Sequence, residues 1–485
     1  MGRGAKRVGV SLPRQHLRRE GRGGERPCSR PPSLVRSEDR VGRSDLRRRA
    51  QDRPVHADLD GKNVNKDWKE ILLRNRVWRS VFRHAYPDNE RLRSEVVTSN
   101  LFLHVHPVKV YPESLEFSKT IGLGLISFYL FVILSVTGVL LMFYYIPYVD
   151  RAYQDMKDLQ FVVSFGVIVR NMHRWAAHAM IIAVFLHMCR VYYTASYREP
   201  REFNWALGVV LLLFTLFLSL TGYLLPWDQL AYWAITIVSN LIGVVPLVGK
   251  KLRYMVLGGT IVGQNALIRF YVMHVIVLPF LAFVLILVHF WRIRKDGGLT
   301  RPDEGVTETG ERDEGGEEKD LKSYGLMNLV EGRTPHVGQD PDRMVTAWPH
   351  LLTRELNLFL IVLIAIMAMS VLFDAPLEEM ANPAVTPNPA KAPWYFVGLQ
   401  ELLSWGNPFW GGIFVPTVAV LALLLLPYVD RGQAGTGEWF HPARRRAVIV
   451  FTVIVVAAIA LILVGEYLRG PNWRLYWPWE KWPLH

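Results

Sequence analysis

The stretch RNMHRWAAHAMIIAVFLHMCR, residues 170–190, places two histidines fourteen positions apart in an otherwise apolar run. A helix turns by about 100° per residue, so fourteen steps end within about 40° of the start, and His173 and His187 share one face. A rise of about 1.5 Å per residue separates them by roughly 21 Å along the axis. His178 points about 140° away from His173 and does not join the pair. A single histidine in such a helix is more often a packing or hydrogen-bonding residue, so only a second helix with matching histidines would indicate a ligand set.

A second helix has such a pair. RFYVMHVIVLPFLAFVLILVHFWRIRKDG, residues 269–297, contains His274 and His289, fifteen positions apart. Fifteen steps rotate by about 60°, so these two imidazoles also share a broad face, roughly 22 Å apart. Two helices with imidazoles at nearly equal heights could clamp two stacked haems, and bis-histidine ligation favours electron transfer because it leaves the iron no open site. Four unrelated histidines, each needing a polar partner in lipid, are the costly alternative.

Composition indicates a membrane protein. The 485 residues are 51% hydrophobic, and the mean hydropathy is +0.15. A membrane-spanning helix needs about 20 apolar residues. We therefore predict an all-α membrane protein with seven transmembrane helices, a four-helix di-haem bundle plus a three-helix C-terminal unit. The seven apolar runs are Ile121–Ile146, Val162–Tyr193, Trp205–Leu225, Ala266–Trp291, Leu356–Phe373, Gly411–Tyr428 and Ala447–Val464.

The distribution of charge and the number of cysteines argue against some classes of function. Of the net charge of +13, the first 60 residues carry 16 Lys/Arg against 8 Asp/Glu, so the charge does not favour nucleic-acid binding. That segment has too little apolar content for a core and no apolar signal region, which predicts a disordered tail. A transit peptide, or a translation start assigned too far upstream, is the alternative explanation. Only Cys28 and Cys189 occur, so we expect neither an iron–sulfur site nor a covalent haem in this chain.

Orientation follows from the Lys/Arg content of the loops. The N-terminus and the second, fourth and sixth loops are the more basic, which predicts a cytoplasmic N-terminus in a bacterial inner membrane. Residues 301–320 hold nine acidic and three basic residues, as expected of a solvated linker. The predicted parts are a basic tail (1–60), a cytoplasmic segment (61–116), the four-helix di-haem domain (117–295), an acidic linker (296–350), the three-helix domain (351–466) and a Trp-rich outer tail (467–485).

Glycines repeat the histidine spacing on the flanking helices. Gly124 and Gly138 are fourteen apart in the first run, and Gly208 and Gly222 are fourteen apart in the third. A haem edge close to a helix backbone needs a position without Cβ. Glycine is common in transmembrane packing, but two pairs in register with the histidines favour one gap for each haem.

At residues 75–465 the chain resembles cytochrome b of the quinol–cytochrome c oxidoreductases. The resemblance rests on the paired histidines, the four glycines, LTGYLLPWDQLAYWA (220–234) and GQNALIRFYVMHVIVLPF (263–280). The fifteen-residue spacing, PWDQ and the seven spans resemble the photosynthetic b-six form, fused here to its three-helix partner.

The resemblance implies two non-covalent b-type haems. His173 and His274 would hold the low-potential haem at the outer, quinol-oxidising site, and His187 and His289 the high-potential haem at the inner, quinone-reducing site. Arg170 and Arg190 match positions that pair with haem propionates. The expected quinone-site residues are Trp227, Arg294, Pro393, Trp394 and Tyr395.

Two positions depart from the family pattern. Gly122 stands where the b-six form has the cysteine of an extra covalent haem, so we expect no such haem. The PEWY motif, whose glutamate takes a proton from quinol, reads KAPWYF (391–396), with Pro393 in the glutamate position. We expect Glu401, about two helical turns after Trp394, to be the substitute acceptor. Asp228 is the second candidate, and pairing of Glu401 with a base is the structural alternative.

These features predict a subunit of a quinol–cytochrome c oxidoreductase that is inactive alone. A Rieske-type iron–sulfur protein and a c-type cytochrome would be separate partner chains, membrane lipid and quinone would surround it, and the relatives imply a homodimeric complex. The alternative is a di-haem membrane anchor that links the quinone pool to a dehydrogenase or reductase without bifurcation. This alternative stays open because Pro393 occupies the position of the proton-accepting glutamate. A role for the basic tail in protein or nucleic-acid interaction has little support.

Overall fold

A computed structural model describes residues 75–81, 87, 89–100, 103–296, 298–300, 344–432 and 434–480. All of them belong to the unit Asn75–His485, and none to the separate unit Met1–Arg74. The predicted tail 1–60 lies outside the described residues, and so do residues 301–343 of the predicted linker.

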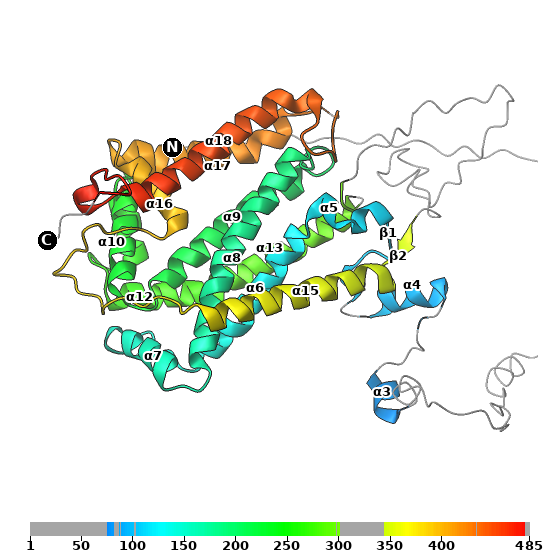
Figure 1. Ribbon diagram of the computed structural model, residues 1–485, viewed down its shortest axis with the longest axis horizontal. Helices are drawn as coiled ribbons and strands as arrows, with labels where there is room; N and C mark the ends of the chain where they lie inside the picture. Colours follow the sequence, from blue (N-terminus) through cyan, green and yellow to red (C-terminus); the bar gives the residue numbers. More distant parts are fainter. Residues whose placement is uncertain are drawn as a thin grey trace, which may run out of the picture. The chain divides into compact units, whose positions relative to one another are not determined.

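Seven helices in the described residues are long and apolar enough to cross a membrane (Figure 1). The predicted all-α membrane fold with seven spans is therefore confirmed. The first four spans are α6 (Leu123–Met142), α8 (Gly166–Tyr193), α9 (Glu202–Tyr223) and the continuous α12–η3–α13 (Gln264–Val272, Met273–Val277 and Leu278–Lys295). The last three are α15 (Ala347–Leu372), η5–α17 (Trp410–Phe414 and Val415–Val429) and η6–α18–η7 (Pro442–Arg444, Arg445–Leu463 and Val464–Leu468).

The fourth span contains a π-helical turn, Met273–Val277, directly before Pro279. Proline has no N–H to donate and its ring crowds the carbonyl four residues earlier, so the wider turn relieves that conflict. A π-turn also absorbs one extra residue. The fifteen steps from His274 to His289 therefore rotate the chain about as far as fourteen α-helical steps, which explains why the two histidine pairs differ by one in the sequence.

The spans pack as two groups around α9. Helix α6 packs on α8, α9 packs on α13, and α15 covers α8 and α6. The core between these helices is apolar and includes Leu130, Phe131, Ala176, Met180 and Ala183. Helix α17 lies against α9, and α18 packs on α16 (Trp394–Leu403). Arg198 Nη2 donates to Asp430 Oδ1 at 2.6 Å, which fastens the loop after α8 to the end of α17.

Shorter elements cap both ends. At the His173 end are α7 (Val149–Phe161), α10 (Gln229–Gly243), α11 (Gly249–Leu257) and α16, with η8 (Pro471–Trp473). Near the His187 end are α4 (Glu90–Ser99), η1 (Leu103–Val105), η2 (Pro112–Leu115), α5 (Phe117–Thr120) and the antiparallel pair β1 (Lys109–Val110) and β2 (Val345–Thr346). Helix α3 is Arg76–Val81. Helix α15 begins at Ala347, inside the range predicted for the linker.

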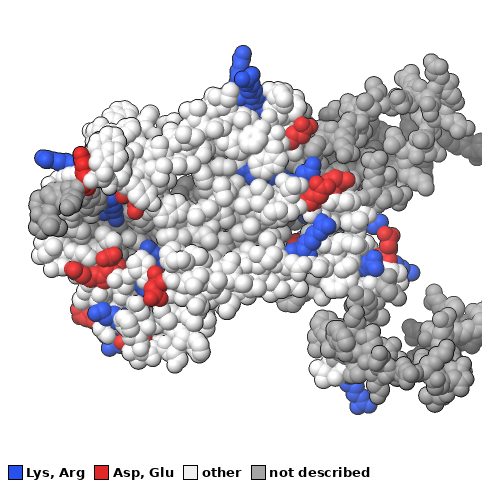
Figure 2. Space-filling model, in the orientation of Figure 1, with Lys and Arg blue, Asp and Glu red and all other residues white. Residues whose placement is uncertain are grey.

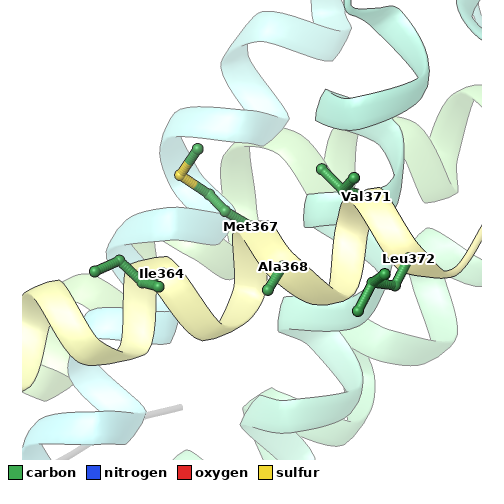
Figure 3. A pocket seen from close by; sticks show the side chains of 5 residues that line it. All are labelled: Ile364, Met367, Ala368, Val371 and Leu372. Carbon is green, nitrogen blue, oxygen red and sulfur yellow. The ribbon is translucent and has the colours of Figure 1, made fainter.

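The surface is that of a protein embedded in lipid. Figure 2 shows charged side chains gathered toward the two ends of the molecule, with a mostly uncharged middle. A shallow pocket on α15 is lined only by Ile364, Met367, Ala368, Val371 and Leu372 (Figure 3). It offers no polar group, so we assign it to the lipid-facing surface.

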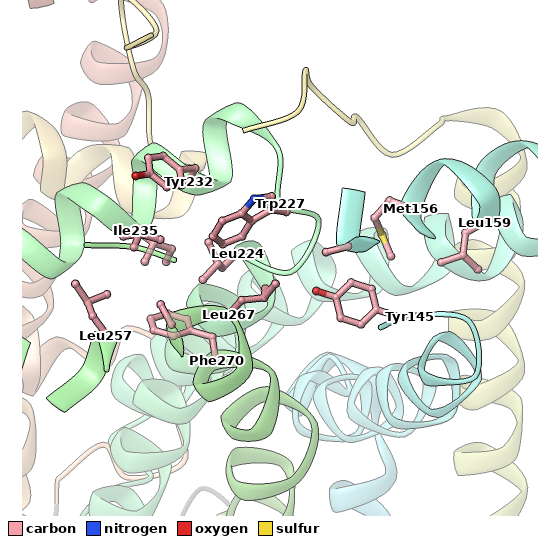
Figure 4. Close-up of a cluster of buried hydrophobic side chains, with 13 residues drawn as sticks. Tyr145, Met156, Leu159, Leu224, Trp227, Tyr232, Ile235, Leu257, Leu267 and Phe270 are labelled. Atoms are coloured by element: carbon pink, nitrogen blue, oxygen red, sulfur yellow. The ribbon is translucent and has the colours of Figure 1, made fainter. Parts of the chain in front are cut away.

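A cluster of buried side chains supports the His173 end (Figure 4). Trp227 and Tyr232 flank the start of α10, with Leu224, Leu267 and Phe270 packed against them. This core fixes the loop between α9 and α10, which carries Asp228.

Candidate functional site

His173 on α8 and His274 on the π-turn face each other across the first bundle. Their ring centroids are 6.1 Å apart, and the ring planes are inclined by 75°. A metal–imidazole bond is about 2 Å long, so two imidazoles that ligate one metal from opposite sides have centroids roughly 6 Å apart. The observed separation fits one metal between the rings.

Hydrogen bonds set the tautomer of both imidazoles. His274 Nδ1 lies 3.0 Å from the carbonyl oxygen of Leu218, which can only accept, so Nδ1 carries the proton. Thr137 donates its hydroxyl proton to the Ile133 carbonyl at 2.7 Å and is 2.9 Å from His173 Nδ1, so it accepts from that nitrogen. Both Nε2 atoms therefore keep their lone pairs, as metal ligation by a neutral imidazole requires.

His187 on α8 and His289 on α13 form the second site. Both line one cavity, together with Arg190, Asn204 and Gly208. The cavity opens between α8, α9 and α13 at the other end of the bundle from His173. Its wall combines apolar side chains such as Val184 and Leu212 with polar ones such as Arg190 and Arg201, which suits an apolar macrocycle with charged substituents.

Each of the four glycines faces one of the four histidines. A methyl group added at Gly222 would lie 2.5 Å from His274 Cε1, and one at Gly138 would lie 3.3 Å from His173 Cε1. At the second site, Gly124 approaches His187 Cε1 to 3.2 Å by the same measure, and Gly208 approaches His289 Cε1 to 3.8 Å. The absent Cβ atoms let the imidazole rings lie close to the backbones of α6 and α9, so the donor set and its surroundings fit two haems.

The two predicted propionate partners are buried. Arg170 donates from Nη1 to the Ala375 carbonyl and from Nη2 to the Pro376 carbonyl, both at 2.8 Å. Arg190 lines the cavity of the second site, and its Nε lies 3.3 Å from the Lys119 carbonyl. Both guanidinium groups therefore hold backbone segments that border a haem site, and the propionate contacts stay a prediction.

Glu401 is part of a closed ion-pair network. Its side chain is fully buried. Arg469 binds both carboxylate oxygens, with Nη2–Oε1 2.6 Å and Nε–Oε2 2.8 Å. The indoles of Trp405 and Trp473 donate to the same carboxylate at 2.8 and 3.1 Å. Burial alone would raise the pKa of Glu401, but the hydrogen bonds from Arg469 and Trp405 outweigh it and hold the pKa below its usual value.

This geometry disfavours the predicted role of Glu401 as proton acceptor. A carboxylate with four donors and a lowered pKa is a weak base. The structural alternative, pairing with a base, describes Glu401 better. The expected pair would lie on the helix surface, whereas the observed pair with Arg469 is buried.

Asp228 caps the N-terminus of α10. Its Oδ1 accepts from the Ala231 N–H at 2.9 Å, and its Oδ2 accepts from the Glu378 N–H at 3.3 Å. Burial raises the pKa of Asp228, against the opposing effect of these two backbone donors. No guanidinium binds this carboxylate bidentately in the described residues, so Asp228 keeps basicity that Glu401 lacks.

The expected quinone-site residues split between the two ends. Pro393 is the N-cap of α16, and Trp394 and Tyr395 are its first residues. Trp227 is buried beside Tyr232. Arg294 is exposed at the His187 end, where Nη1 donates to the His104 carbonyl at 2.8 Å.

Residues 108–297 match the family model described as cytochrome b/b6/petB, and residues 380–476 match cytochrome b(C-terminal)/b6/petD. Cytochrome b6 of Tupiella akineta is 43% identical over 175 residues, which cover 36% of this chain and 81% of the relative. Cytochrome b6 of Heliomicrobium gestii is 41% identical over 192 residues, covering 40% and 88%.

The chain belongs to the cytochrome b/b6 family. A chain of the solved structure titled "Hyperthermophilic respiratory Complex III" shares the fold, with a TM-score of 0.61 and 24% identity over 78% of this chain and 90% of that one. As a member of the cytochrome b/b6 family, the chain is a haem-binding membrane subunit of a complex of the cytochrome bc or b6f type, in electron transport.

Within this cytochrome b fold the structure joins a predicted quinone-site residue, Trp394, to side chains that the sequence prediction gave no role at the site. The Trp394 indole Nε1 donates to His178 Nδ1 at 3.0 Å. Arg174, one turn before His178 on α8, lies over the ring of Tyr223 at 5.3 Å. The only signal in the sequence was that His178 sits off the haem-facing side of a membrane helix, which by itself did not select a partner.

Proposed function

We propose that this chain is the di-haem subunit of a quinol:cytochrome c oxidoreductase, with His173 and His274 on one b-type haem and His187 and His289 on the other. The observation that carries the proposal is the pair of opposed imidazoles with both Nε2 lone pairs free, beside glycines that let these rings lie close to the neighbouring helix backbones. When bound, the haems supply one-electron transfer along the bundle.

The His173 end is the proposed outer, quinol-oxidising side. Quinol loses two electrons and two protons there. One electron passes to a separate iron–sulfur protein of the Rieske type, and the other crosses the bundle to a quinone on the inner side, where Arg294 is the expected quinone-site residue. A c-type cytochrome chain would take the electron from the iron–sulfur protein. Only two cysteines occur in the 485 residues, which supports separate chains for these partners.

Asp228 is the proposed proton acceptor in place of the missing glutamate. Its carboxylate is buried at the same end as Trp394, is not held in an ion pair with Arg469 as Glu401 is, and has a raised pKa. A group must be ionised to accept the proton, so quinol oxidation should rise with pH through the pKa of Asp228.

The test is the rate of haem reduction by quinol in the purified complex. General-base catalysis contributes about 10²–10⁴-fold, so Asp228→Asn should slow the step by at least about tenfold and flatten its pH dependence. Glu401→Gln is the comparison variant for the other candidate acceptor; because this variant should be less stable, both rates are expressed per bound haem and measured well below its melting temperature. An unchanged rate in Asp228→Asn with a large loss in Glu401→Gln would restore Glu401 as the acceptor.

The second candidate is a di-haem membrane anchor without bifurcation, favoured by Pro393 at the proton position. The subunit that copurifies separates the two. An iron–sulfur protein of the Rieske type supports quinol:cytochrome c oxidoreduction, whereas a molybdenum or flavin subunit supports the anchor.

A further inference from the structure

The imidazole of His178, on α8, lies among three aromatic rings near the start of α16. Its ring lies 5.6 Å from that of Trp175, 6.2 Å from Trp394 and 6.0 Å from Tyr395, centroid to centroid. The Tyr395 ring stands edge-on at 89°. Flat aromatic walls around a polar atom are typical of sites for flat ligands.

One nitrogen of this imidazole is fully engaged and the other is not. An indole N–H can only donate, so Trp394 requires His178 Nδ1 to be the acceptor. In the neutral ring the proton is then on Nε2. That atom is shielded from solvent and has no hydrogen-bond partner among the residues that the structure describes. Buried polar groups are nearly always paired, and three aromatic rings lie close to this imidazole, so the partner we infer for its N–H is an acceptor atom of a ligand.

A second unpaired donor lies one helical turn away. Arg174 Nε is also buried without a partner in the described part of the chain. Residues four apart on a helix are neighbours on one face, so both residues with an unpaired donor lie on the same face of α8. A ligand that matches them has acceptor oxygens on a flat ring, which describes a quinone head group.

We propose that His178 binds the quinone of the outer site by donating its Nε2–H to a ring oxygen, with Trp394 as the residue that fixes the imidazole tautomer. This inference rests on the proposed function, because it needs a quinone site at the His173 end. His178 donates here and does not take the substrate proton, so its role is separate from that of Asp228.

The experiment compares wild type, His178→Phe and His178→Asn in the purified complex. Phenylalanine keeps the ring without an N–H, and asparagine keeps a donor. Decylubiquinol and a reduced dimethylnaphthoquinone serve as probes, with KM, kcat, haem content and melting temperature as readouts. His350→Phe, at an exposed position near the start of α15, is the matched control.

Loss of one ligand hydrogen bond should raise KM about tenfold in His178→Phe, with kcat and haem content nearly unchanged. Asparagine should restore most of the affinity. Trp394→Phe should raise KM by a smaller factor, because the tautomer is then no longer fixed. An unchanged KM in His178→Phe overturns the inference, as does a parallel fall of kcat, haem content and melting temperature that asparagine does not rescue.

A binding measurement separates this inference from the proposed function. If wild type oxidises neither quinol, the dissociation constant of oxidised decylubiquinone is measured directly. Binding that weakens about tenfold in His178→Phe supports the His178 site while quinol oxidation fails. Wild type that neither binds nor oxidises the probes overturns both proposals.

Discussion

Alanine substitution at the four glycines should affect haem binding in a graded order set by the distances to the histidines. At Gly222 a new methyl carbon would lie 2.5 Å from His274 Cε1. Ordinary carbon–carbon contacts are about 3.5–4.0 Å long, so the ring has to move by about 1 Å. A ligand constellation tolerates displacements of about 0.5 Å, so Gly222→Ala should misplace His274 as a ligand.

The matched control is Gly208→Ala. Its methyl carbon would lie 3.8 Å from His289 Cε1, which is ordinary contact. Alanine is also the better helix former by about 1 kcal/mol, so this variant should melt no lower than wild type and lose the least haem of the four. Gly124 and Gly138, at 3.2 and 3.3 Å, should give intermediate losses.

The assay is haem per polypeptide by pyridine haemochrome, with optical spectra that resolve the two haems. Disturbing the support of a metal ligand commonly weakens metal affinity by about 10–100-fold, so Gly222→Ala should lose most of the His173–His274 haem and keep the other. Full haem content in Gly222→Ala, or a larger loss in Gly208→Ala, would refute the reasoning.

Three further outcomes are expected. Acid–acetone should extract all haem from the chain, because Gly122 has no thiol that could form a thioether bond to haem; haem that stays on the polypeptide band would contradict this. Glu401→Gln should lower the melting temperature strongly, since removing one partner of a buried ion pair costs about 3–5 kcal/mol; an unchanged melting curve would show that the Arg469 network adds nothing. The folded-state pKa of Glu401 is lowered, so its contribution to stability is complete above the usual carboxyl pKa and is lost as the pH falls through the lowered value. The gap between wild type and Glu401→Gln in melting temperature should therefore shrink only on strong acidification, and a gap that shrinks as the pH rises would contradict the sign.

The membrane spans could be predicted because each apolar run carries its own signal. The residues at which these helices begin and end could not be predicted. Helix α15 begins nine residues before the apolar run, because Arg354 and Glu355 interrupt the apolar pattern while the helix continues through them, held by contacts such as Glu355 Oε2 to His106 Nε2, 2.9 Å apart. Helices α7, α10, α11 and α16 are short or amphipathic caps, so neither length nor hydropathy distinguished them from loops.

The residues of the candidate site fall into two groups as well: those that a local spacing predicts, and those that only contacts between distant segments bring together. Histidine and glycine spacings are local and periodic, and they placed the residues that face each other across the bundle. Two partners of Glu401, Arg469 and Trp473, are not local: they lie beyond two further spans of the chain, so no spacing pattern links them to Glu401. The contact between His178 and Trp394 likewise joins α8 to α16, so neither residue type nor spacing could have revealed it.

The most direct test is a redox titration of the purified chain, followed by the absorbance of its haems. The predicted result is two haems per polypeptide that titrate as separate one-electron components, of which His187→Ala removes one and leaves the spectrum of the other unchanged. A single haem in wild type, or two unchanged haems in His187→Ala, would contradict the assignment of these four histidines.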